Sequence, residues 1–171
     1  MIEIIKHSIR FVLFLIAQAF IFNQLEIGLG IQLMVYPLYI FLLPLQMNVF
    51  LLMLISFGLG FGIDLFSNTY GLHASSALVI AYGRPYLLKL FEPRDGFDPG
   101  IELTIYSMGY AWFGYVFGAF LLAHTMWFFL IEQFKWSEFW YIVLKTALGV
   151  PMSLIICLLI QFLFFKKPVK R

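Results

Sequence analysis

The sequence has little charge and almost no cysteine. Only 12% of its 171 residues are charged, whereas 63% are hydrophobic. A soluble domain of this size still leaves about a third of its unfolded-chain surface in water, so it could not bury this much apolar surface. We therefore expect lipid to surround most of the side chains. The single cysteine, Cys157, excludes an intramolecular disulfide, and we expect it to act as a small hydrophobe in its apolar run.

The sequence also lacks the common motifs of catalysis and metal binding. It contains no G-x-S-x-G elbow, no Walker phosphate loop, no H-E-x-x-H and no Cys/His set at metal-ligand spacing. No pair of short, Gly/Pro-broken helices repeats between two halves, as in many secondary transporters. We accordingly expect no enzymatic activity, no catalytic residue, no cofactor, no metal site and no nucleic-acid partner.

Long apolar runs predict an all-α membrane protein, a bundle of six transmembrane helices forming one domain over residues 1–171. A membrane helix needs about 20 mostly apolar residues. Such runs cover 8–27, 29–45, 47–66, 70–83, 103–131 and 139–165. The second run contains Pro37 and Pro44. The fourth is interrupted at Arg84-Pro85 and has an amphipathic continuation to Phe91.

The basic residues predict the orientation of this bundle. With six spans both ends lie on one side, and cytoplasmic segments carry an excess of Lys and Arg. A cytoplasmic N-terminus would leave only Lys135 and Lys145, of the eleven basic residues, toward the outside. We therefore expect both termini and the largest loop, 84–102, to be cytoplasmic. The basic tail 166–171 would then lie against anionic lipid headgroups.

Asp64 is the most informative single residue, because a carboxylate near the middle of a membrane helix costs about 2.5–3.5 kcal/mol. It could serve an ion or proton relay, contact a partner, cap the turn at 67–68, or pair inside the bundle with His73 or Arg84. Arg84 would lie roughly 20 Å away along the next helix. We therefore expect Asp64 to hold His73 or the turn's N–H groups, and Asp64→Asn to keep most of the function.

Glycines and loop acids give further expectations. Gly58 with Gly62, and Gly114 with Gly118, form G-x-x-x-G pairs that let helix backbones approach, and we expect both pairs to pack inside the bundle. The loop acids Glu92, Asp95, Asp98 and Glu102 are interpreted as a solvated docking loop, since their spacing fits no calcium loop. Turns are expected at Asp95-Gly96 and at Asp98-Pro99-Gly100.

One segment of the sequence resembles a known family. Residues 58–85 contain a Gly-rich helix ending in Asp64, a short polar turn, and then Gly71-Leu72-His73-Ala74 and Ala81-Tyr82-Gly83-Arg84-Pro85. This pattern resembles the rod-shape-determining MreD family, and Pro93-Arg94-Asp95-Gly96 resembles a loop in one branch of it. The resemblance implies structural or partner-contact roles, and no catalytic role, for Asp64, Gly71, His73 and Arg84. Further candidates for such roles are Gly58, Gly62, Pro85, Arg94, Asp95 and Gly96.

The resemblance implies a scaffold of the bacterial inner membrane within the elongation machinery that builds sidewall peptidoglycan. Its partner would be the bitopic protein MreC, and through it MreB, RodA and a peptidoglycan transpeptidase. The implied fold is similar to the S component of energy-coupling-factor transporters.

Two alternatives remain open at this point. The first is a true S component, the substrate-binding subunit of a vitamin transporter. The Ala-x-x-x-Ala docking pair usual in the first helix of S components is missing, because Ala17 and Ala19 are only two apart. We therefore expect no tightly bound vitamin. The second is a lipid-handling protein or an ion-channel subunit, which would rest on Asp64 alone.

Overall fold

The computed structural model describes residues 2–25, 27–98 and 100–165, and this part of the chain is all-helical with no strand. The long helices are α1 (Ile2–Ile16), α3 (Val49–Ser67), α4 (Leu72–Leu90), α6 (Tyr110–Gln133) and α7 (Phe139–Phe164). A π-helical turn, Ala17–Ile21, and a 3-10 turn, Phe22–Gln24, continue α1. The short elements are α2 (Pro37–Leu42), α5 (Ile105–Met108) and a 3-10 turn, Trp136–Glu138.

Four segments are long and apolar enough to cross a membrane: Glu3–Gln24, Val49–Ser67, Tyr110–Gln133 and Phe139–Phe164. Large apolar side chains cover their outward faces; Leu13, Leu54 and Ile155, for example, are each more than half exposed. A surface of this kind is stable when lipid covers it. The chain is therefore a membrane protein.

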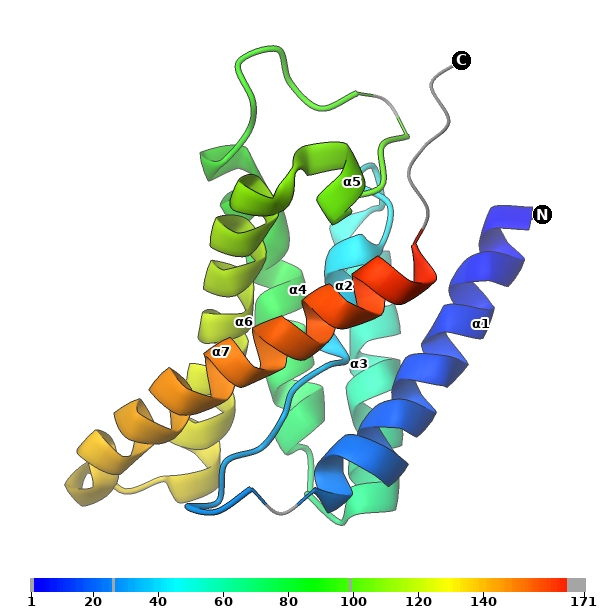
Figure 1. Cartoon of the computed structure of the whole chain (residues 1–171). Coiled ribbons are helices and arrows are strands. Elements are labelled where there is room, and N and C mark those ends of the chain that lie inside the picture. The colour runs from blue at the N-terminus through cyan, green and yellow to red at the C-terminus, as the bar shows by residue number, and fades with distance from the viewer. Residues whose placement is uncertain (1, 26, 99, 166–171) are drawn as a thin grey trace.

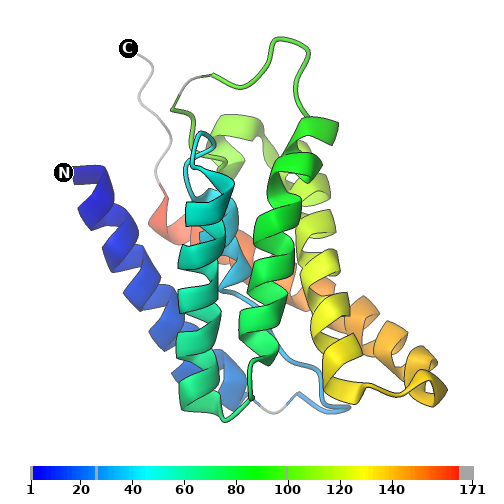
Figure 2. The same ribbon diagram turned by 180° about the vertical axis from the view of Figure 1, so that it is seen from behind.

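The helices run alternately up and down one bundle. In Figures 1 and 2, α3, α4 and α6 stand side by side, α7 crosses them diagonally, and α1 leans at the edge. The beginning of α1, the end of α7 and the loop between α4 and α5 lie at one end. The α3–α4 turn and the chain that follows α1 lie at the other. We call these the terminal end and the far end.

The second predicted helix, 29–45, is wrong as a membrane-spanning helix. Only Pro37–Leu42 is helical there, and all six of its residues are buried. Residues 32–36 are non-helical chain running through the interior of the bundle. Pro37 occupies the first helical turn and Pro44 cannot continue the helix. The segment therefore runs from the far end toward the terminal end partly as extended chain.

Side chains of neighbouring helices satisfy the exposed backbone of this extended segment. The Met34 amide donates to Ser153 Oγ at 2.9 Å, and the Val35 amide donates to Gln18 Oε1 at 2.8 Å. Gln18 Nε2 also donates to the Leu33 carbonyl at 2.8 Å. Non-helical backbone at membrane depth is tolerated only where protein or water surrounds it. Gln18 and Ser153 supply those partners here.

Two other predicted boundaries need correction. Arg84-Pro85 does not interrupt the fourth helix, because α4 continues through both residues to Leu90. The fifth predicted helix, 103–131, is broken at Gly109, whose φ of +86° separates α5 from α6. The tail 166–171 and Pro99, for which a headgroup contact and a turn were predicted, lie outside the described residues.

Candidate functional site

The Asp64 carboxylate caps the N-terminus of α4. Its Oδ2 accepts the Ala74 amide at 2.9 Å, and its Oδ1 accepts the His73 amide at 3.1 Å. Gly71 precedes this helix with φ +92°, and it has no side chain that could cap the helix. The first N–H groups of a helix have no intrahelical partners and carry partial positive charge. A carboxylate from α3 therefore does what a capping residue of α4 itself would ordinarily do.

Two side chains of the turn complete this contact. The Thr69 hydroxyl donates to Asp64 Oδ1 at 2.5 Å, and His73 Nδ1 lies 3.0 Å from the same oxygen. His73 is fully buried and Asp64 is 5% exposed. The expected contact of Asp64 with His73 and with backbone N–H groups is thus present. Arg84 is not a partner of Asp64.

A second group of polar side chains extends this cluster toward α1 and α6. The Tyr36 hydroxyl lies 3.1 Å from the His73 carbonyl and 2.5 Å from His124 Nε2. Because a carbonyl only accepts, Tyr36 donates to it, and His124 Nε2 then donates to the Tyr36 oxygen. Asn23 donates to Ser67 Oγ at 2.8 Å. The cluster therefore ties α1, the extended segment, α3, α4 and α6 together.

Arg84 serves a different part of the structure. It is 2% exposed, and its guanidinium donates to the carbonyls of Phe41, at 2.9 Å, and Leu43. These are carbonyl groups at the C-terminus of α2, where orphan acceptors and partial negative charge gather. The Pro44 carbonyl lies 3.4 Å from Nη1. Arg84 is thus a helix cap at the terminal end of the bundle.

The predicted glycine pairs behave differently from each other. A Cβ on Gly62 would meet Leu15 Cδ1 at 2.6 Å, and one on Gly58 would lie 4.0 Å from Phe11, so this pair faces α1. Gly114 and Gly118 have no atom within 4 Å of such a Cβ, so the expectation that they pack inside the bundle is wrong. Gly60 makes the closest approach to another backbone, because a Cβ there would lie 2.6 Å from the His73 carbonyl oxygen.

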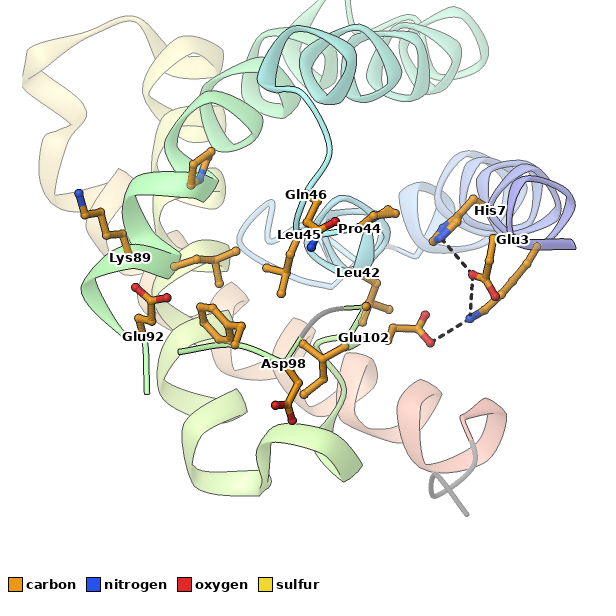
Figure 3. Close-up of a pocket in the computed structure, with 16 residues that line it drawn as sticks. Glu3, His7, Leu42, Pro44, Leu45, Gln46, Lys89, Glu92, Asp98 and Glu102 are labelled. Carbon is orange, nitrogen blue, oxygen red and sulfur yellow. Dashed lines mark hydrogen bonds and ion pairs between the residues drawn. The ribbon is translucent and has the colours of Figure 1, made fainter. Parts of the chain in front are cut away.

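A cavity of about 600 Å³ opens at the terminal end of the bundle. Figure 3 shows Glu3 and His7 of α1 on one side and Lys89 and Glu92 at the end of α4 on the other. Glu102 and Asp98 lie between them. The apolar lining comes from the α2–α3 connection and the neighbouring segments: Leu42, Pro44, Leu45, Leu88, Phe97 and Ile101. We call this cavity the terminal pocket.

Ion pairs join α1 to the loop on one wall of the terminal pocket. Glu102 accepts from Lys6 Nζ at 3.0 Å and from Arg10. Lys6 also lies 3.7 Å from Glu3. Burial alone would raise the pKa of Glu102, but the hydrogen bonds from Arg10 and Lys6 outweigh it and lower the pKa below its ordinary value. The carboxylate form therefore holds the loop against α1.

This ion-pair wall predicts a dependence of stability on pH. A lowered folded pKa stabilises the protein above the ordinary glutamate value of about 4.3. That contribution disappears as the pH falls through the lower, folded value. In detergent near neutral pH, the unsubstituted protein should therefore have a higher unfolding temperature than Glu102→Gln. The two unfolding temperatures should become equal as the pH is lowered into the acid range. A constant difference at every pH would contradict this role for the charge.

The candidate residues other than Gly58 and Gly62 fall into three places. Asp64, Gly71 and His73 meet at the α3–α4 junction, and Arg84 with Pro85 lies near the terminal pocket. Arg94, Asp95 and Gly96 lie in the loop, where the Gly96 amide closes the expected turn on the Pro93 carbonyl at 2.9 Å. Gln18, Asn23 and Tyr36 were not predicted from the sequence. Only their polarity inside apolar runs could have indicated them.

Comparison with protein-family models, with curated proteins and with solved structures finds no match to this chain.

Proposed function

We propose that this protein is a non-enzymatic scaffold of the bacterial inner membrane that resembles MreD and binds the bitopic protein MreC within the cell-elongation machinery. One observation carries the proposal best. Both oxygens of Asp64, the acid of a membrane-spanning helix, accept hydrogen bonds from the neighbouring turn and helix. Asp64 and His73 therefore hold the bundle together and do not line the terminal pocket.

The exterior offers surfaces that suit a protein partner. Gly114 and Gly118 leave a smooth strip on α6 beside the exposed side chain of Tyr115. Small residues at this spacing allow a second transmembrane helix to approach closely. We propose this strip as the place where the single transmembrane helix of the partner packs.

The S-component alternative has less support. An uptake subunit needs a cavity with converging polar groups that opens to the outside at some stage. The terminal pocket lies at the end that holds the beginning of α1, which the distribution of basic residues favours as cytoplasmic. A vitamin entering there would arrive from the wrong side.

The orientation gives a direct prediction. We propose six crossings, with 31–42 forming the second and α4 the fourth, and with both termini in the cytoplasm. A reporter that is active only in the cytoplasm should work when fused after Arg171 and fail when inserted at Asn68, in the turn after α3. The reverse pattern would overturn the orientation.

The function itself is tested by depleting the protein in the bacterium that encodes it, which the proposal expects to be rod-shaped. Loss of the protein should give round, wide cells with dispersed sidewall synthesis, and re-expression should restore rods. Affinity purification of the protein should recover MreC. Normal rods after depletion, with no MreC recovered, would contradict the proposal.

A further inference from the structure

We propose that the terminal pocket binds the basic, partly apolar cytoplasmic flank of a single-span membrane protein. This inference rests on the proposed function and names the second contact that the partner would make. The pocket is built by four separate parts of the chain: α1, the segment after α2, the end of α4 and the loop before α5. It lies at an end of the bundle and is large enough to receive several side chains.

The charge of the pocket selects a cationic occupant. Four carboxylates line it, Glu3, Glu92, Asp98 and Glu102, against only two lysines, Lys6 and Lys89. Lys6 is already held by Glu102 and Glu3. Glu92 and Asp98 make no ion pair with any described residue. Their charges therefore face the pocket rim without a cation among those residues.

The surroundings make this acidic spot selective. Most of the basic residues that the structure describes lie at the same end, including Lys6, Arg10, Lys89 and Arg94. Anionic lipid headgroups are attracted to that end as a whole, but the carboxylates of the pocket repel them locally. A lysine or arginine of a peptide would find acceptors there, and a neighbouring large apolar side chain would cover Leu45 and Ile101.

The source of such a peptide follows from membrane topology. A single-span protein with a cytoplasmic N-terminus keeps Lys and Arg next to the cytoplasmic end of its helix. A helix packed on the glycine strip of α6 would end at the same level as the terminal pocket. At about 3.3–3.6 Å per residue, an extended flank of five or six residues can reach across half a bundle. The pocket would then fix the orientation of the partner helix.

Arg84 keeps the floor of the pocket in place. It binds the carbonyls of Leu43 and Pro44, and Pro44 and the next residue, Leu45, line the pocket. The Glu102 ion pairs hold the opposite wall. A pocket with a fixed floor and wall requires little ordering when a peptide enters, which favours affinity.

The test compares charge reversals in co-purification of full-length protein with co-expressed MreC. Glu92→Lys combined with Asp98→Lys should lower the MreC recovered by about tenfold, without lowering the unfolding temperature. Glu138→Lys reverses a single charge at the far end, half of the charge change in the double variant, and should leave recovery unchanged. Reversing the basic flank of MreC to glutamate should weaken binding to the unsubstituted pocket and restore binding to the reversed one.

The outcomes separate the two proposals. If MreC is never recovered, the proposed function fails and this inference fails with it. If MreC binds but the pocket reversals change nothing, or if the charge swap restores nothing, the inference is wrong while the function stands. If the reversals release a tightly bound phospholipid in native mass spectrometry and leave MreC binding intact, the pocket is a lipid site and the inference is overturned.

Discussion

Gly60→Ala should prevent α3 and α4 from packing and should remove most of the folded protein from the membrane. A Cβ at this position would lie 2.6 Å from the His73 carbonyl oxygen and 2.7 Å from the Ala74 amide nitrogen. Both obstructing atoms are backbone, in the very turn that Asp64 caps, so no side chain can move aside. Overpacking in a dense core commonly costs about 1–3 kcal/mol, and we expect the upper end or more here.

Gly58→Ala is the matched control for this substitution. Gly58 lies on the same helix, two residues earlier, and its added methyl group would meet only Phe11 Cζ at 4.0 Å. Gly58→Ala should have nearly the same membrane abundance and unfolding temperature in detergent as the unsubstituted protein. Both values should be far lower for Gly60→Ala. Equal behaviour of the two variants would mean that α3 and α4 do not approach as described.

Substitutions of Asp64 should lower the stability of the protein more, the more hydrogen-bond acceptors they remove. Asp64→Leu removes the partner of four donors: the Thr69 hydroxyl, the His73 ring and the His73 and Ala74 amides. Each buried donor left without a partner costs about 1–3 kcal/mol, so this variant should not accumulate. Asp64→Asn keeps one acceptor oxygen but turns an amide NH₂ toward another donor. We expect it to fold with reduced stability.

Cell shape and abundance must be measured together for these variants. Asp64→Asn should complement in proportion to the protein that remains in the membrane. If Asp64→Asn reaches full abundance and yet abolishes rod shape, the charge has a role beyond the fold. That result would revive the relay hypothesis for Asp64.

The structure changes one expectation about Asp64 that follows from the sequence alone. Position on the helix correctly indicated His73 and the turn as its partners, because distance along a helix follows directly from residue number. It could not show that Oδ2 also caps α4 through Ala74. From the sequence, Asp64→Asn was expected to keep most of the function. The structure instead predicts that this variant keeps only part of its stability and function.

Other parts of the fold could be predicted where they depend only on the length of an apolar run. The ranges of α3 and α7 nearly match the predicted runs, since a spanning helix needs a fixed number of apolar residues. The non-helical path around Val35 was not predictable in this way. Its stability depends on Gln18, 17 residues from Val35, and on Ser153, 119 residues from Met34. Arg84 was likewise placed in a loop, because its carbonyl partners in and after α2 are distant in sequence.

Native mass spectrometry of the protein purified from its own host, with MreC at natural level, tests the central claim most directly. The claim is that this chain holds a membrane protein partner and carries no small substrate. We predict a complex containing MreC, with no vitamin or other small metabolite retained in stoichiometric amount. A chain recovered without MreC and carrying one molecule of a vitamin would contradict the scaffold function and favour a transporter subunit.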